Sequence, residues 1–212
     1  MIHRKTAARA DGRDVFLNCP YDTDYVPLFR AIVFAIHDCG FAARPALAQN
    51  NGAEWRLSKI NRLIRSCSLG IHDISRTELD AATGLPRFNM PLELGLFLGA
   101  REFGDEEQRQ KRCLVLDRER DRYLKFISDL RGQDPVNHDA DPLLAIAVVR
   151  DWLDEQSGDS TILPDGSVMA SRFTVFTSEL PAICADLKLS LAALTYKNYV
   201  QLMRRWLAAN PA

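Results

Sequence analysis

The feature that most constrains the fold is the alternation of short apolar segments with longer segments of helical periodicity. The short segments have the length of β-strands and are apolar along most of their length, which indicates burial on both faces. Strands that alternate with helices in this way predict an α/β protein with a mostly parallel central sheet. The predicted strands are Asp14–Asn18, Phe41–Leu47, Ser68–Ile74 and Cys113–Asp117.

The predicted helices follow these strands. Pro27 opens the first helical pattern and Gly40 ends it, since glycine is common just after a helix. Pro91 is placed at the first helical position of another helix, which runs to about Glu102. The remaining helical segments in this part of the chain are predicted near 57–67 and 121–130, and a loop is predicted at 49–52.

The last third of the chain has a different pattern. Helices are predicted at 145–153, 181–194 and 196–209, with a possible last strand at Phe173–Phe176. We interpret this region as a helical extension that packs on the sheet, or as a dimer surface. The expected organisation is a polar arm at 1–13, an α/β domain at 14–140, and a mainly helical extension at 141–212 that packs on the same domain.

Composition excludes several classes of protein. Lys and Arg number 27 against 28 Asp and Glu, and a net charge of −1 argues against direct nucleic-acid binding and against a polybasic membrane anchor. No apolar run approaches the roughly 20 residues that span a bilayer, and residues 1–13 lack the apolar region of a secretory signal. The 5 cysteines form no Cys-x-x-Cys pair and the 4 histidines show no metal-binding spacing. We expect a cytoplasmic protein without a metal site or a membrane partner.

Three of the predicted strands end in polar residues, namely Asn18, Asp73 and Asp117. In open parallel sheets, ligands bind outside the carboxyl ends of the strands. The loop after the first strand contains neither the Gly-x-Gly-x-x-Gly nor the Gly-x-x-x-x-Gly-Lys pattern, so it matches neither a dinucleotide-binding turn nor a P-loop. The sequence therefore predicts a ligand site at this edge that is built in another way.

Glu93 is the most unusual candidate, because it lies among leucines in an apolar helix that follows a long irregular loop. A buried carboxylate costs free energy unless it has a partner, and the positive end of the helix would keep it ionised. The functional interpretation makes Glu93 a nucleophile or a stabiliser of positive charge. The structural alternative is a first-turn glutamate that accepts hydrogen bonds from backbone N–H groups. The local sequence pattern favours neither of these two interpretations of Glu93.

Two further candidate residues, Asp73 and Cys19, can also be explained by a structural role alone. Asp73 would hold a ribose hydroxyl or orient the substrate, or it would be a carboxylate in a turn. Cys19 is interpreted as a wall of the pocket, because no histidine is paired with it by sequence. His72 alternates with apolar residues and is interpreted as a packed histidine, and the stripe Arg56, Lys59 and Arg62 as a solvated helix face.

Two stretches of the chain are similar to known families. Asp14-Val-Phe-Leu-Asn-Cys-Pro-Tyr-Asp22 and the helix-then-strand segment 59–75 resemble TIR-like domains. Residues 74–99, with their Glu-Leu-Gly helix, resemble nucleoside 2-deoxyribosyltransferases. The resemblance covers about residues 14–135. It implies a flavodoxin-like three-layer sandwich and chemistry at an N-glycosidic bond. Substrates in the superfamily include nucleosides, nucleotides and NAD+, so NAD+ would be a substrate rather than a cofactor. Bacterial proteins of this kind often act in antiviral defence and assemble as homo-oligomers.

The resemblance also implies roles for particular residues. Glu93 matches the catalytic glutamate, Asp73 the aspartate near the sugar, and residues 16–19 the wall of the pocket. No metal or cofactor is implied. The full set of predicted substrate-binding residues is Phe16, Leu17, Asn18, Cys19, Tyr21, Asp73, Ser75, Asn89 and Met90.

Three functions stay open at this point. The first is NAD+ cleavage by hydrolysis, cyclisation or base exchange through Glu93. The second is the same chemistry on nucleosides or nucleotides, as a deoxyribosyltransferase or hydrolase. The third is a non-catalytic nucleotide sensor or assembly module, because Arg87-Phe-Asn-Met-Pro91 stands where the transferase family has a small Asp-Ser-Gly-Thr segment.

Overall fold

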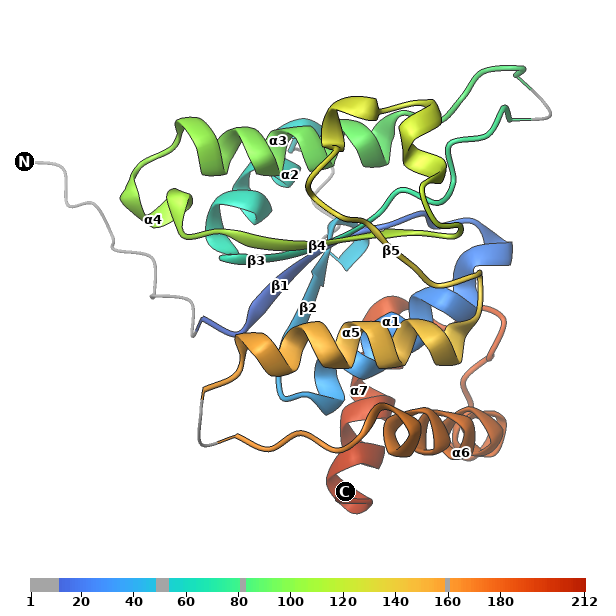
Figure 1. Cartoon of the computed structure of the whole chain (residues 1–212). Helices are drawn as coiled ribbons and strands as arrows, with labels where there is room; N and C mark the ends of the chain where they lie inside the picture. Colours follow the sequence, from blue (N-terminus) through green and yellow to red (C-terminus); the bar gives the residue numbers. More distant parts are fainter. Residues whose placement is uncertain (1–11, 49–53, 81–82, 159–160) are drawn as a thin grey trace, which may run out of the picture.

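A computed structural model describes residues 12–48, 54–80, 83–158 and 161–212. Its centre is a five-stranded sheet in the order β2-β1-β3-β4-β5, and every neighbouring pair is parallel (Figure 1). The strands are β1 (Asp14–Asn18), β2 (Ala42–Pro45), β3 (Leu69–Asp73), β4 (Arg112–Asp117) and β5 (Val136–Asn137). The predicted α/β class with a parallel sheet is therefore confirmed.

Helices cover both faces of the sheet. On one face lie α2, α3 and α4, and on the other lie α1 and α5, while α6 and α7 form a further layer outside α1 and α5 (Figure 1). The arrangement is a three-layer sandwich of the flavodoxin-like type with an additional helical layer. The helices are α1 (Val26–Asp38), α2 (Arg56–Ser66), α3 (Asn89–Phe103), α4 (Glu106–Arg109), α5 (Pro142–Gln156), α6 (Gly166–Asp186) and α7 (Tyr196–Ala209).

Side-chain alternation along β1 divides the core in two. Val15 and Leu17 pack toward α1 and α5, whereas Phe16 packs toward α2 and α3, where its ring centroid lies 6.4 Å from that of Phe97. Because successive side chains of a strand point to opposite faces, this apolar run fills both cores. The same alternation determines toward which face of the sheet the polar side chains at the ends of the strands point.

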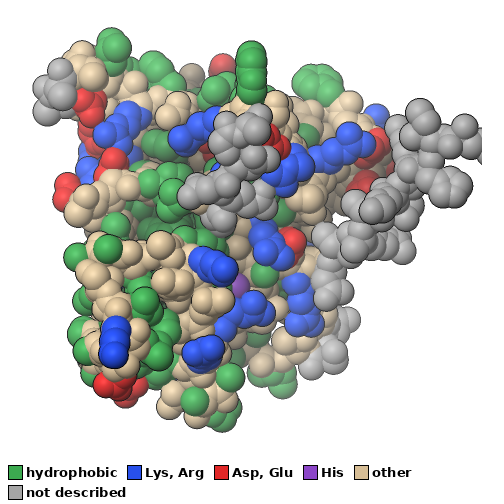
Figure 2. Space-filling model, turned by 180° about the vertical axis from the view of Figure 1, so that it is seen from behind, with side chains coloured by type: hydrophobic (Ala, Val, Ile, Leu, Met, Phe, Trp, Pro, Cys, Tyr) green, Lys and Arg blue, Asp and Glu red, His purple; other side chains and the backbone are tan. Residues whose placement is uncertain are grey.

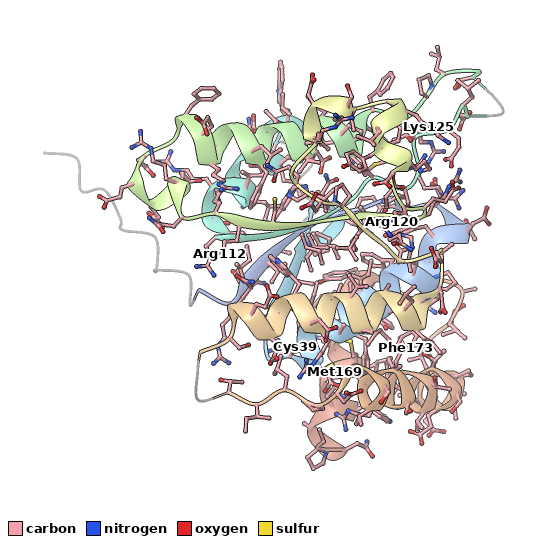
Figure 3. All side chains as sticks on the ribbon, in the orientation of Figure 1. Cys39, Arg112, Arg120, Lys125, Met169 and Phe173 are labelled. Atoms are coloured by element: carbon pink, nitrogen blue, oxygen red, sulfur yellow. The ribbon has the colours of Figure 1, made fainter. Side chains whose placement is uncertain are left out.

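The C-terminal helices complete the core on the α1 side. Six consecutive residues of α1, from Ala31 to Ile36, are fully buried, because the helix is covered by the sheet on one side and by α6 and α7 on the other. The Phe34 ring lies 5.4 Å from that of Phe173 in α6, and Cys39 Sγ lies 3.9 Å from Met169 Sδ (Figure 3). The region beyond residue 140 therefore contributes directly to the main core.

The predicted last strand at Phe173–Phe176 is wrong, because these residues lie inside α6. Phe173, Phe176 and Leu180 are buried at spacings of three and four, which is the period of a helix, and a run of four residues cannot distinguish the two structures. The fifth strand is instead the two-residue β5. The helical segment predicted at 181–194 is likewise the end of α6 followed by a loop.

Two other predictions differ from the structure in detail. Helix α3 begins at Asn89, two residues before Pro91, so the proline is not its first residue. The helix predicted at 121–130 consists of two short 3₁₀ turns, Arg122–Lys125 and Ser128–Leu130. Most of the predicted arm, residues 1–11, and the whole of the loop predicted at 49–52 lie outside the described residues. Within the described parts of the chain, no helix is long and apolar enough to cross a membrane.

Gly70 in β3 gives a test of how closely the α3 side of the sheet is packed. A Cβ added at Gly70 would lie 2.8 Å from the Phe97 ring and from His72 Nε2, whereas a Cβ at Gly95 in α3 would meet nothing within 4 Å. We expect Gly70→Ala to lower the free energy of unfolding by about 1–3 kcal/mol through overpacking. Gly95→Ala should raise it by about 0.5–1 kcal/mol, because alanine favours a helix. Urea unfolding measures both, and a Gly70→Ala protein as stable as the wild type would contradict the packing described.

Candidate active site

Buried polar side chains gather where the parallel strands end. Asn18, Asp73 and Asp117 end β1, β3 and β4, and each is at most 1% exposed. Since β3 lies between β1 and β4, the three residues share one edge of the sheet. Their side chains take different directions, because Asn18 and Asp117 follow the alternation toward α3 whereas Asp73 shares the α1 side with Ile71.

Asn18 fastens the beginning of α3 to the sheet. Its side-chain Nδ2 donates to the backbone carbonyl of Met90 at 2.8 Å and lies 3.1 Å from His72 Nδ1. Burial, with a smaller effect of the Lys111 charge, lowers the pKa of His72 to about 3, so the imidazole is neutral and its Nδ1 can accept. One amide thus joins β1, β3 and α3, which fixes the first turn of α3 at the carboxyl edge.

Glu93 is the fifth residue of α3, in its second turn, and is 6% exposed. Burial raises its pKa to about 7, and the charge of Arg56 at the start of α2 lowers it only in part. No hydrogen bond or ion pair reaches Glu93 from the residues that the structure describes. A pKa of about 7 leaves this carboxyl only partly ionised at neutral pH, so burial outweighs the predicted effect of the helix N-terminus, whose field falls off within the first turn. The alternative that Glu93 accepts hydrogen bonds from backbone N–H groups of the first turn is wrong as well, since no backbone N–H of the described residues donates to it.

Cys19 and Tyr21 follow β1 and lie near Glu93. Burial raises the pKa of both groups well above its usual value, and the charge of Glu93 adds to each shift. The Cys19 thiol is therefore held neutral, which fits a pocket wall better than a nucleophile. The Tyr21 ring meets that of Phe29 edge to face at 5.9 Å, so it also faces α1.

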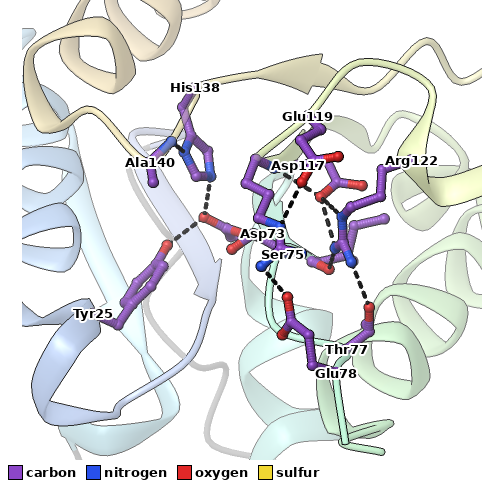
Figure 4. Close-up of polar contacts among 12 residues, drawn as sticks. Tyr25, Asp73, Ser75, Thr77, Glu78, Asp117, Glu119, Arg122, His138 and Ala140 are labelled. Atoms are coloured by element: carbon purple, nitrogen blue, oxygen red, sulfur yellow. Dashed lines mark hydrogen bonds and ion pairs between the residues drawn. The ribbon is translucent and has the colours of Figure 1, made fainter.

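Asp73 is completely buried, and each of its oxygens has a partner within the chain (Figure 4). Oδ1 accepts the backbone N–H of Ser75 at 2.8 Å. Oδ2 accepts the hydroxyl of Tyr25 and lies 3.0 Å from His138 Nε2. Burial alone would raise the pKa of Asp73, but His138, Ser75 and Tyr25 together hold it below its usual value. The carboxylate therefore joins the loop after β1, strand β3 and the residue after β5.

Asp117 forms a second buried pair on the α3 side. Its Oδ1 accepts Arg122 Nε at 2.8 Å and the backbone N–H of Arg118 at 2.7 Å (Figure 4). Arg122 also donates to the Ile74 carbonyl at 2.8 Å and to Thr77 Oγ1 at 3.0 Å, so it ties the 3₁₀ turn to the loop after β3. Within the described residues, Asp117 Oδ2 has no hydrogen-bond partner, and burial raises the pKa of this carboxyl despite Arg122.

The remaining predicted residues fall into three groups. Phe16 and Leu17 are core residues on opposite faces of β1. Ser75 and Met90 are buried, one against Asp73 and the other against Ile74 and Leu94. Asn89 is exposed at the start of α3. The structure therefore brings Asn18, Cys19, Tyr21 and Met90 to the neighbourhood of Glu93, and it turns Asp73 toward the other side of the sheet.

Sequence reasoning missed Tyr25, Arg122 and His138. His138 follows a strand of only two residues, which leaves almost no pattern to recognise. Arg56 is exposed, as predicted for a solvated face of α2, and its charge also acts on Glu93. Arg87, in the loop before α3, pairs with Asp22 after β1 and lies 3.1 Å from Asp80 Oδ2, so two loops of this edge are joined by one guanidinium.

No group of three or more His, Cys, Asp or Glu that could hold a metal ion occurs within the described parts of the chain. No family model matches the chain, and no curated protein is significantly similar to it. The site is therefore interpreted from its own residues.

Asp73→Asn tests whether the buried carboxylate supports the fold. We expect this variant to lose about 1.5–3 kcal/mol of unfolding free energy, since it weakens the charge-assisted hydrogen bond from the Tyr25 hydroxyl and removes the charge that lies 3.0 Å from His138 Nε2. Because the native pKa of Asp73 is lowered, its contribution is present above the unfolded pKa of about 3.9 and is lost as pH falls through the native value.

The measurement is urea unfolding at pH 7 and at a series of pH values below 5. The stability gap between wild type and Asp73→Asn should shrink toward the acid end of the series. Asp129→Asn, at an exposed aspartate, is the matched control and should change stability by less than about 0.5 kcal/mol. A gap that widens on acidification would contradict the ionised state assigned to Asp73.

Proposed function

We propose that the protein is an enzyme that cleaves the N-glycosidic bond between ribose and nicotinamide in NAD+, with the Glu93 carboxylate as the residue that contacts the sugar. In this reaction the bond from C1′ to the pyridinium nitrogen breaks, and its electron pair leaves with neutral nicotinamide. Positive charge develops on the ribose, as in glycoside hydrolysis. Attack at C1′ by water, by the adenine of the same molecule or by another base then gives hydrolysis, cyclisation or base exchange.

The observation that carries the proposal is the state of Glu93. It is a carboxylate buried to 6% exposure at the ligand-binding edge of a parallel sheet, with no hydrogen-bond or ion-pair partner among the described residues. A buried carboxylate without a partner is costly, and such groups cluster at functional sites. A ribosyl cation would supply the missing positive charge, so its stabilisation by Glu93 would be greatest in the transition state.

One neighbour of Glu93 and the chemistry of the leaving group favour a dinucleotide over a nucleoside. Arg56 is exposed at the first residue of α2, close enough for its charge to act on Glu93, and no carboxylate pairs with it among the described residues. A guanidinium in this position suits the phosphates of NAD+. Nicotinamide leaves from its pyridinium form as a neutral molecule and needs no proton, whereas departure of the base from an uncharged nucleoside benefits from a general acid.

Glu93→Gln tests the role of the carboxylate. We expect the wild type to consume NAD+ and the variant to lose at least about 100-fold in rate, because the amide cannot stabilise a ribosyl cation. Mass spectrometry of NAD+ incubated with each protein gives both the loss of substrate and the mass of the product. Low and high protein concentrations show whether assembly is required.

Glu102→Gln is the control, because Glu102 is an exposed glutamate on the same helix and should retain full activity. Equal consumption of NAD+ by wild type and Glu93→Gln would refute the role of Glu93. Release of base from nucleosides but not from NAD+ would favour the deoxyribosyltransferase or hydrolase alternative. Binding of nucleotides without any turnover would favour a sensor.

The pH dependence of the rate distinguishes an ionised Glu93 that acts on NAD+ from a protonated Glu93 that acts as a general acid on nucleosides. Because the pKa of Glu93 is raised to about 7, the ionised fraction increases through neutral pH. If the carboxylate is the active form, kcat/KM for NAD+ should rise about tenfold per pH unit below this pKa and level off above it. A rate that falls as pH rises through 7 would instead identify the protonated form, as expected for a general acid acting on nucleosides. The profile of residual activity in Glu93→Gln should lack this limb.

A further inference from the structure

A separate cavity lies beyond Tyr21, between α1 and the C-terminal helices, and it does not include Glu93. Its volume is about 170 Å³. For scale, an apolar cavity of about 150 Å³ engineered in another protein binds benzene. The lining residues come from the loop after β1, the first turns of α1, the turn after β2 and the segment from the α6–α7 loop into α7: Pro20, Tyr21, Asp22, Val26, Phe29, Arg30, Leu47, Ala192, Leu194, Tyr196 and Tyr199.

Aromatic rings make up much of the wall. Phe29 stands between Tyr21 and Tyr196, with both ring centroids 5.9 Å from its own. The phenol groups of α7 are already used inside the chain, since Tyr196 Oη donates to the Ala43 carbonyl at 2.9 Å and Tyr199 Oη to the Arg30 carbonyl at 3.1 Å. These two tyrosines are therefore held in place and offer the cavity their rings rather than their hydroxyls.

Arg30 supplies the positive charge. Its guanidinium lies 5.3 Å from the centroid of the Tyr199 ring, and no carboxylate lies within ion-pair distance of it among the described residues. Asp22 also lines the cavity, but its carboxylate is paired with Arg87. Arg44 and Arg204 lie near His37 on the neighbouring part of the surface, and Figure 2 shows Lys and Arg side chains gathering on the lower half of the rear face, where acidic side chains are few.

We propose that this cavity binds a single-ring aromatic carboxylate, whose ring packs against Phe29 and the tyrosines and whose carboxylate meets the Arg30 guanidinium. The volume admits one ring and the wall is aromatic, so an aliphatic chain or a fused-ring base fits less well. An arginine that no carboxylate of the described residues pairs with offers a planar fork of donors that matches a carboxylate. The site lies outside the proposed catalytic residues, and its occupancy would fix the α6–α7 loop against α1.

The test is titration calorimetry of the whole chain with three probes: benzoate, its neutral isostere benzamide, and cyclohexanecarboxylate. For so small a ligand we expect a dissociation constant on the order of 1 mM for benzoate. Benzoate should bind at least about tenfold more tightly than either of the other probes, because each of them lacks one of the two features that the cavity recognises.

Two pairs of variants locate the binding. Ala192→Trp places an indole at the mouth of the cavity and should abolish benzoate binding, whereas Trp at the neighbouring exposed Ala193, which does not line the cavity, should leave it unchanged. Arg30→Gln should reduce benzoate affinity to that of benzamide, while Arg205→Gln, at an exposed arginine of α7, should not. Thermal unfolding followed by circular dichroism shows that each variant is folded.

The outcomes are decisive in both directions. Benzoate binding that Ala192→Trp abolishes and Ala193→Trp preserves supports the site. No saturable heat with benzoate, equal affinity for benzamide, or full retention of binding in Ala192→Trp overturns it. The Glu93→Gln protein should bind benzoate like the wild type, so failure of the glycosidase proposal and failure of this one are distinguished.

Discussion

The buried carboxylate of Asp73 is the interaction on which the carboxyl edge of the sheet depends. It lies at the end of the central strand β3, is fully removed from solvent, and holds groups from three separate parts of the chain. A charge in this position is tolerated only because every oxygen has a partner. Tyr25 directly precedes α1 and His138 lies between β5 and α5, so this one carboxylate ties the segments that lead into both helices to the end of β3.

Glu93 represents the opposite arrangement on the other side of the sheet. It is nearly as buried as Asp73, but no hydrogen bond or ion pair reaches it from the described residues, and its pKa is raised where that of Asp73 is lowered. The difference follows from desolvation with and without compensating partners. Asp73 stabilises the fold at its own edge, and Glu93 keeps a carboxylate whose partner would come from outside the chain. Asn18 holds α3 in place on the Glu93 side, because its amide donates to the Met90 carbonyl.

The C-terminal helices do more than cover the sheet. Phe173 and Phe176 of α6 pack on Phe34 of α1, so the outer layer belongs to the principal core. The loop that connects α6 to α7 then returns to the first turns of α1, where it closes the aromatic cavity beside Arg30. The last third of the chain thus contributes both to the core and to the wall of the aromatic cavity.

The sequence by itself determined the fold class and the edge at which polar groups meet. Apolar strands that alternate with helices predict a parallel sheet, and the three strands that end in Asn18, Asp73 and Asp117 bring these residues to one edge, because the period of the pattern is a local property. The direction of each side chain, the partners Tyr25 and His138, and the two-residue β5 could not be derived in this way. They depend on contacts between residues far apart in the chain. Burial decided the state of Glu93 for the same reason, since only the packed structure removes water from a carboxylate that the sequence places near a helix start.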